Sequence, residues 1–197
     1  MLSRRLGHIL DRPLGGLARK IDVPPNAITL CGFLISAMAG VVLAGNLRLG
    51  GVLVVVGAFF DAFDGVTARV NKRATDFGAF LDSVLDRYAD AFILSGIAVY
   101  LLGRQNISGF LLSLASLFGA FLTSYARARA EGLGIDCKEG LIERPERIIL
   151  IAAGTIAGFL MPALWALAVL GNITVLQRMF HVWKICRGKS PVHRGGC

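Results

Sequence analysis

Residues 61–86 read DAFDGVTARVNKRATDFGAFLDSVLD, and this stretch constrains how the chain can fold. It places Asp61, Asp64, Asp82 and Asp86 within otherwise apolar segments. A carboxylate loses its hydration in such surroundings, which is costly unless it is paired, bound to a metal or open to a polar cavity. The first two aspartates are three positions apart and the last two are four apart, so each pair lies on one face of a helix.

The polar run between the two pairs predicts a loop that joins two antiparallel helices. In such a hairpin Asp61 lies at the same depth as Asp86, and Asp64 at the same depth as Asp82. At 1.5 Å per residue, Asp61 lies roughly 13 Å from the loop. Converging carboxylates repel unless a cation lies between them, and oxygen-only ligands favour Mg²⁺ or Mn²⁺ over zinc. A hard divalent cation beside Arg69 also suits phosphate oxygens, which indicates phosphoryl chemistry. A polar hairpin held only by Asp–Arg pairs is the alternative.

The composition predicts an all-α integral membrane protein. Of the 197 residues, 55% are hydrophobic and 17% are charged, and the mean hydropathy is +0.65. Several apolar stretches reach the roughly 20 residues that cross a bilayer. The sequence predicts six transmembrane helices, at residues 27–46, 50–70, 77–102, 107–127, 146–161 and 162–183, with the last two divided at Met161-Pro162.

The predicted membrane domain covers residues 23–186. Residues 1–22 combine regularly spaced leucines with arginines, which predicts an amphipathic juxtamembrane helix on the membrane surface; a helix packed on a partner or on the bundle is the alternative. Residues 187–197 are expected to form a basic cytosolic tail.

Lysine and arginine lie mostly on one side of these spans, the exceptions among 21 being Arg48, Arg87 and Arg104. The positive-inside rule therefore predicts a multi-pass cell-membrane protein with both termini and the carboxylates on the cytoplasmic side. The net charge of +8 suits contact with anionic membrane lipids, whereas nucleic-acid binding is disfavoured because the basic residues rim the spans. The four cysteines have no metal-ligand spacing and imply no disulfide framework.

A second polar cluster, SYARARAEGLGIDCKEGLIERPERI at residues 124–148, joins the fourth and fifth predicted spans on the side of the carboxylates. The arginines of this cluster and of the end of the sixth span are Arg127, Arg129, Arg144, Arg147 and Arg178. Together they predict an anion pocket for a phosphate on a soluble substrate, and ordinary positive-inside charge paired with nearby glutamates is the alternative. Asp90 continues the helix face of Asp82 and Asp86, and we expect it to support Arg87 or a ligand.

The aspartates belong to a longer pattern. Asp61-x-x-Asp64-Gly65-x-x-Ala68-Arg69, then eight residues, then Gly78-x-x-x-Asp82-x-x-x-Asp86, resembles the signature of the CDP-alcohol phosphatidyltransferases at every fixed position. Pro25-Asn26-x-x-Thr29 is similar to the start of that family's first membrane helix. The resemblance implies a six-helix membrane homodimer that displaces CMP from a CDP-linked lipid with an alcohol.

The resemblance also implies site residues. Asp61, Asp64, Asp82 and Asp86 would hold Mg²⁺ or Mn²⁺, two ions in all, and Asp86 would also be the catalytic base. The residues expected to bind a CDP-diacylglycerol-type lipid are Asn26, Thr29, Asp61, Gly65, Ala68, Arg69 and Gly78.

The expected acceptor is inositol phosphate, because residues 124–131 and 143–147 are similar to the branch of the family that makes phosphatidylinositol phosphate. The resemblance assigns the acceptor phosphate to Arg127, Arg147 and Arg178, and the charge cluster described above adds Arg144 and Arg129 to the predicted pocket. The residue that corresponds to Arg127 is lysine in actinobacterial members. Arginine keeps the positive charge but arranges its hydrogen-bond donors differently. Glycerol phosphate, free inositol or serine as acceptor, an archaeol-based donor, and cation transport stay open as alternatives.

Overall fold

The structure, a computed structural model, describes residues 16, 24–71 and 74–188. Six helices follow one another there and no strand is found among these residues, which confirms the all-α prediction. The helices are α2 (Pro25–Leu43), α3 (Leu47–Val70), α4 (Asp76–Gly103), α5 (Ile107–Glu131), α6 (Arg144–Ala157) and α7 (Leu160–Gly188). Apart from residues 16, 187 and 188, the predicted juxtamembrane helix at 1–22 and basic tail at 187–197 lie outside the described residues.

Four of these helices, α2, α3, α5 and α7, are long and apolar enough to cross a membrane. Helix α4 has 28 residues but carries several charged side chains. Helix α6 has only 14 residues, about 21 Å, against roughly 30 Å of hydrocarbon. The predicted 16-residue span at 146–161 is therefore wrong in its bounds. Gly158, at φ 84°, ends α6, and Pro162 lies in the first turn of α7, where its missing N–H costs little.

Polar side chains fix where three of the helices begin. The side chains of Asn46, Thr75 and Asn106 accept hydrogen bonds from backbone N–H groups three residues further on, at 3.1, 3.0 and 2.9 Å. Each satisfies a donor that the first turn of a helix leaves without a partner. These caps set the positions of α3, α4 and α5 along the bundle.

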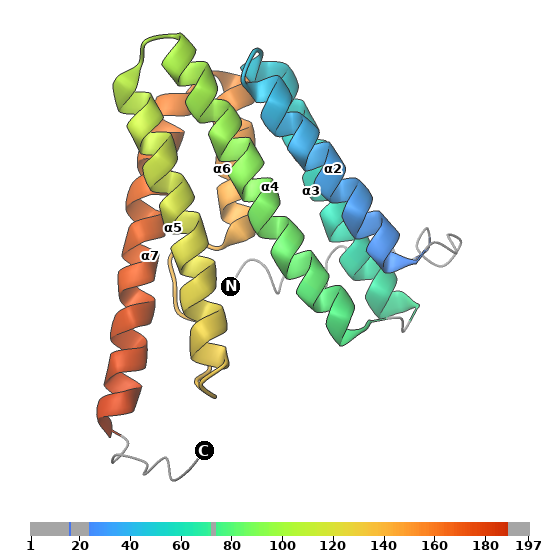
Figure 1. The fold of residues 1–197 in the computed structure, drawn as a ribbon, viewed down its shortest axis with the longest axis vertical. Helices are drawn as coiled ribbons and strands as arrows, with labels where there is room; N and C mark the ends of the chain where they lie inside the picture. The colour runs from blue at the N-terminus through green and yellow to red at the C-terminus, as the bar shows by residue number, and fades with distance from the viewer. Residues whose placement is uncertain (1–15, 17–23, 72–73, 189–197) are drawn as a thin grey trace, which may run out of the picture.

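Helix α2 packs against both α3 and α4, and these two helices have little contact with each other (Figure 1). Helices α3 and α4 therefore follow one another along the chain as predicted, but each packs mainly against α2 instead of against the other. Glycines explain this, because a Cβ at Gly96 would lie 1.9 Å from the Gly40 carbonyl oxygen, and one at Gly57 would lie 2.4 Å from Ser36 Oγ. Only glycine lets the backbones of α2 and α4 approach this closely.

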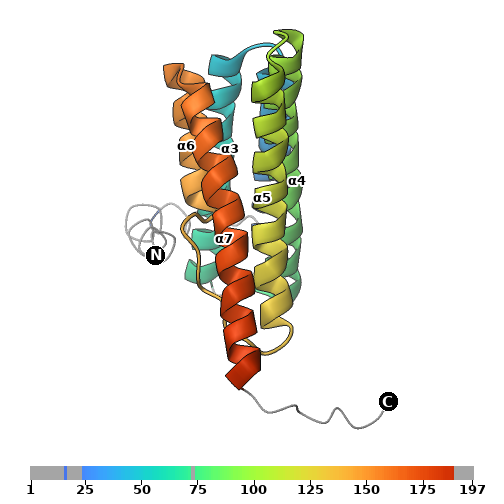
Figure 2. The ribbon, with the colours of Figure 1, turned by 90° about the vertical axis from the view of Figure 1, so that its left-hand side faces the viewer.

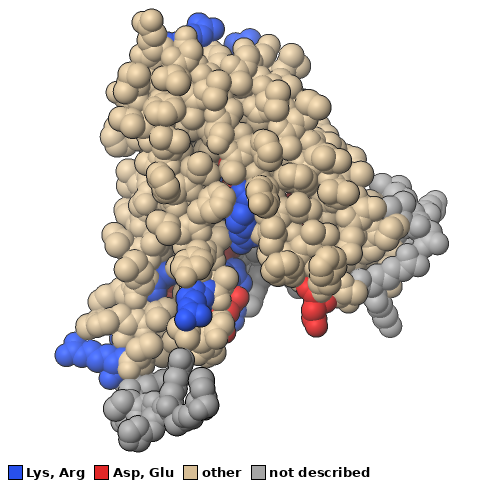
Figure 3. Space-filling model, in the orientation of Figure 1, with Lys and Arg blue, Asp and Glu red and all other residues tan. Residues whose placement is uncertain are grey.

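The second half of the bundle is formed by α5 and α7, which pack against each other, while α6 contacts α3 and α7 (Figures 1 and 2). The shared core includes Leu43, Ile93, Ile97 and Leu164, all fully buried. Helices α4 and α5 are joined at the upper end in Figure 1 and diverge toward the lower end. Figure 3 shows basic side chains along a hollow between the two halves there, below an upper region that is almost free of charge.

Candidate active site

Three of the four predicted metal ligands converge. Asp61 and Asp64 on α3 and Asp82 on α4 each offer a carboxylate oxygen, and these oxygens all lie within 4.8 Å of one another. Asp64 is only 6% exposed, and its Oδ2 has no hydrogen-bond partner among the described residues. A buried carboxylate oxygen without a donor fits a ligand of a hard divalent cation, so this oxygen set suits Mg²⁺ or Mn²⁺.

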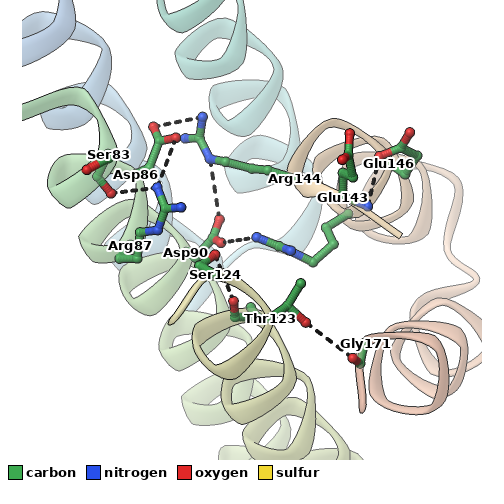
Figure 4. A network of polar contacts seen from close by, with 12 residues as sticks. Ser83, Asp86, Arg87, Asp90, Thr123, Ser124, Glu143, Arg144, Glu146 and Gly171 are labelled. Atoms are coloured by element: carbon green, nitrogen blue, oxygen red, sulfur yellow. Dashed lines mark hydrogen bonds and ion pairs between the residues drawn. The ribbon is translucent and has the colours of Figure 1, made fainter. Parts of the chain in front are cut away.

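The fourth aspartate, Asp86, is linked to this cluster through an arginine. Arg144, the first residue of α6, donates a hydrogen bond from Nη1 to Asp61 Oδ2. The same nitrogen lies 2.8 Å from Asp86 Oδ1 (Figure 4). Arg87 lies 3.6 Å from the other oxygen of Asp86 and donates to the Ser83 carbonyl at 2.6 Å. Arg144, predicted from the sequence to bind the acceptor phosphate, thus lies between a metal-cluster carboxylate and the predicted base.

Asp90 anchors the start of α6. Arg147 Nη2 donates to Asp90 Oδ2 at 2.8 Å, and Arg144 Nε lies 3.8 Å from Asp90 Oδ1 (Figure 4). Asp90 is 4% exposed and Arg147 is 5% exposed. Asp90 was expected to support Arg87 or a ligand. Arg87 instead pairs with Asp86, so the protein partner of Asp90 is corrected to the arginines of α6.

The sequence of α6 explains how its two arginines reach this position. A capping box begins the helix, in which the Glu143 N–H donates to Glu146 Oε2 at 3.0 Å. Arg144 and Arg147 are three positions apart and so share the face that is turned toward α4. Both arginines were predicted to line an acceptor pocket. Instead, Arg144 binds Asp61 of α3 and Arg147 binds Asp90 of α4, which the sequence did not indicate.

A first cavity, of about 210 Å³, lies beside the carboxylates. We call it the donor cavity because residues predicted to bind the CDP-linked lipid line it. Of the seven residues predicted to bind the CDP-linked lipid, all except Asp61 line it: Asn26, Thr29, Gly65, Ala68, Arg69 and Gly78. Asp64 and Asp82 line it as well. A Cβ at Gly78 would lie 3.0 Å from both Asn26 Oδ1 and Thr75 Oγ1, so a larger side chain would intrude on this space.

A second cavity, of about 850 Å³, lies between α4 and α5. We call it the acceptor cavity because it is lined by Arg127, one of the residues predicted to bind the acceptor phosphate. Its polar lining includes Ser83, Arg87, Ser124 and Arg127. Arg127 Nε donates to Glu131 Oε1 at 2.9 Å, and its Nη1 lies 3.9 Å from Glu143 Oε1.

The other predicted acceptor arginines take different places. Arg147 is buried against Asp90, as described above. Arg178 is 2% exposed and donates to the carbonyls of Thr123 and Glu139, at 2.6 and 2.8 Å, which ties α7 to α5 and the following loop. Arg129 lines a third cavity, between α5 and α7. It is two positions after Arg127 on α5, and two positions along a helix turn a side chain by about 200°, so the two arginines face different cavities. The five arginines therefore do not line one pocket.

Comparison with known proteins connects this geometry to a family. A family model described as CDP-alcohol phosphatidyltransferase matches residues 22–185. The chain is 42% identical over 183 residues to an archaetidylinositol phosphate synthase of Methanothermobacter thermautotrophicus, covering 89% of this chain and 91% of that one.

Two solved structures are similar to the whole bundle, both of phosphatidylinositol phosphate synthase from Mycobacterium tuberculosis. The form with CDP-DAG bound has a TM-score of 0.79 at 31% identity, covering 89% of this chain and 94% of that chain. The form in complex with manganese and citrate has a TM-score of 0.81 at 30% identity, covering 86% and 88%.

Proposed function

Because the chain belongs to the CDP-alcohol phosphatidyltransferase family, we propose that it transfers a phosphatidyl-type group from a CDP-linked lipid to inositol phosphate and releases CMP. One observation carries this proposal: the donor and acceptor cavities meet at α4. Asp82 and Gly78 line the first, Ser83 and Arg87 line the second, and Ala79 lines both. The two cavities thus adjoin on α4, where Asp82 of the donor cavity is followed directly by Ser83 of the acceptor cavity, and Asp86, which lines neither, lies one turn further along the helix.

Asp61, Asp64 and Asp82 are the residues that would hold the divalent cation. When bound, Mg²⁺ or Mn²⁺ neutralises the donor diphosphate and the charge that develops on the leaving CMP. The family resemblance and the nearby Asp86 favour two ions, with Asp86 at the edge of the cluster.

The residues of the chain then have distinct tasks. Asn26, Thr29 and Arg69 offer polar contacts to the nucleotide, and Gly65, Ala68 and Gly78 leave room for it. Asp86 accepts the proton of the acceptor hydroxyl, whose oxygen bonds to the lipid-side phosphorus while the bond from that phosphorus to the CMP oxygen breaks. Arg144, bound to both Asp61 and Asp86, holds the base beside the metal cluster.

A phosphorylated acceptor suits the charge around the acceptor cavity. Arg87 and Arg127 line this cavity and Glu131 is the acidic residue among its lining, so its lining carries a net positive charge. Guanidinium groups bind phosphate through paired, charge-assisted hydrogen bonds, which favours inositol phosphate over serine or free inositol. Holding the acceptor phosphate in this way places the attacking hydroxyl, and such positioning is worth several kcal/mol of barrier, about 7–11 at most.

The membrane arrangement is also part of the proposal. We place α4 and α6 inside the bilayer with the four apolar helices, because Asp90 and Arg147 face the bundle interior and pair there. The basic end of the bundle, which carries the carboxylates, faces the cytoplasm. A homodimer follows from the family resemblance.

The test is CMP release by purified protein with Mg²⁺ and either CDP-diacylglycerol or its archaeol counterpart. Inositol phosphate, glycerol phosphate, inositol and serine are compared as acceptors, and we expect release with inositol phosphate. Asp86→Asn should lose turnover and still bind the CDP-lipid. Asp76→Asn, an exposed carboxylate in the first turn of α4, is the matched control and should stay active.

Each part of the proposal can fail separately. Release with another acceptor would overturn the inositol phosphate assignment and leave the transferase reaction intact. Most of the activity remaining in Asp86→Asn would show that another group takes the proton. The two donors distinguish a diacylglycerol from an archaeol lipid.

A further inference from the structure

The third cavity, about 480 Å³ between α5 and α7, is not used by the proposed reaction. Apart from Tyr125 it shares no lining residue with the donor or acceptor cavity. No acidic side chain lines it, so it offers no metal ligand and cannot repeat the donor site. It lies at the same end of the bundle as the carboxylates, because the C-terminal ends of α5 and α7 form it.

The lining of this groove is apolar with a charged edge. Leu122, Met179 and Trp183 contribute apolar surface, and Arg129 is the exposed cation. The Arg187 guanidinium lies 5.1 Å from the centre of the Trp183 ring, which places a second cation beside one of the lining residues. Arg178 also lines the groove, but its hydrogen bonds to the Thr123 and Glu139 carbonyls commit it to the fold.

The surroundings of the groove are those of a membrane interface. Helices α5 and α7 are both long and apolar enough to cross a bilayer. Tyr125, 67% exposed, and Trp183, 52% exposed, lie toward their charged ends, where aromatic side chains meet the headgroup region. A groove in this position opens to lipid. Its apolar lining suits an acyl chain and its exposed arginine suits a negative headgroup, so the groove matches an anionic amphiphile.

We propose that this groove binds one anionic phospholipid, with an acyl chain along the apolar lining and the headgroup phosphate at Arg129. The inference rests on the chain lying in a membrane and does not depend on which acceptor the enzyme uses. It assigns Arg129 to lipid binding, whereas the arginine cluster in the sequence predicted that Arg129 binds the acceptor phosphate.

Tryptophan fluorescence can test this directly, because the chain has only two tryptophans. Trp165 is also exposed but lies 18 residues before Trp183 on α7, about 27 Å away. In Trp165→Phe protein reconstituted in vesicles, only Trp183 reports. Brominated phosphatidylglycerol is compared with brominated phosphatidylcholine at the same mole fraction, in vesicles that otherwise hold unlabelled phosphatidylcholine.

We expect Trp183 to be quenched preferentially by the brominated phosphatidylglycerol, with roughly a five-fold preference for one arginine contact. Arg129→Gln should remove most of this preference. Arg104→Gln, which removes the same charge beside Tyr100 at the opposite end, should leave it unchanged. Trp165, measured in Trp183→Phe protein, should show no such preference and reports that the variants remain inserted.

Three outcomes would overturn the inference. Equal quenching of Trp183 by the two lipids would show no selectivity for a negative headgroup. A preference that persists in Arg129→Gln would place the phosphate elsewhere. No quenching by either lipid would show that protein, such as a second copy of this chain, covers the groove. None of these results depends on CMP release, so they are separate from a failure of the proposed reaction.

Discussion

Asp90 is the residue whose replacement we expect to destabilise the fold most through charge. Its carboxylate is 4% exposed and lies 2.8 Å from Arg147 and 3.8 Å from Arg144. Asp90→Asn keeps the shape but leaves the buried Arg147 facing a neutral amide. Removing one partner of a buried ion pair costs about 3–5 kcal/mol, because the remaining charge stays desolvated without compensation.

A double-mutant cycle separates this pair from other effects. Arg147→Gln alone should cost less than Asp90→Asn, because Arg144 still faces the carboxylate. The double variant Asp90→Asn/Arg147→Gln buries two neutral amides, so it should be more stable than Asp90→Asn alone. We expect a coupling free energy of about 2–3 kcal/mol between the two positions.

The assay is unfolding in detergent micelles, followed by circular dichroism during a denaturant titration. Lys138→Gln is the control, because Lys138 and Asp136 form an exposed pair whose loss should have no measurable effect. Additive costs in the double variant, or an Asp90→Asn protein as stable as Lys138→Gln, would refute the view that the Asp90–Arg147 pair holds α6 in place.

Two further predictions concern packing and metal. Gly96→Ala should destabilise the bundle by about 1–3 kcal/mol or more, since its Cβ would overlap the Gly40 backbone, whereas Gly103→Ala meets nothing within 4 Å and should be tolerated; equal unfolding midpoints would contradict the close contact. Chelation by EDTA should abolish CMP release, and Mg²⁺ or Mn²⁺ should restore it, with a higher metal concentration needed after Asp64→Asn. Full activity in EDTA would contradict the role of the carboxylate cluster.

The convergence of Asp61, Asp64 and Asp82 could be predicted from the sequence, because helical spacing and a short loop determine it. The sequence also predicted Asp86 at the depth of Asp61, and both aspartates approach the same Arg144 nitrogen, but the arginine between them could not be predicted. Arg144, which lies 2.8 Å from Asp86 Oδ1, comes from a helix far along the chain, and no local pattern specifies which charges meet across a bundle. The Glu143–Glu146 capping box was a readable signal for the start of α6, but hydropathy gave different bounds.

The packing of α2 against both α3 and α4 could not be predicted from local sequence patterns either. Glycines at positions 40, 57 and 96 indicate that backbones approach closely somewhere, but they do not name the helix that approaches. Once α2 occupies that place, α3 and α4 are held apart, and their carboxylates face a space wide enough for a cation instead of one another's side chains.

Charge balance then explains why the enzyme places a short, capped helix against its carboxylates. The network contains Asp61, Asp64, Asp82, Asp86 and Asp90 on one side and Arg87, Arg144 and Arg147 on the other. With these groups ionised, two negative charges are left, which one divalent cation neutralises. A donor diphosphate brings further negative charge into the same space, and this favours a second ion when the substrate is bound. The arginines of α6 thus neutralise part of the cluster while the carboxylates of α3 and α4 keep enough charge to bind metal. This division of charge between fixed guanidinium groups and exchangeable cations accounts for both Arg144 at Asp86 and the unpartnered oxygen of Asp64.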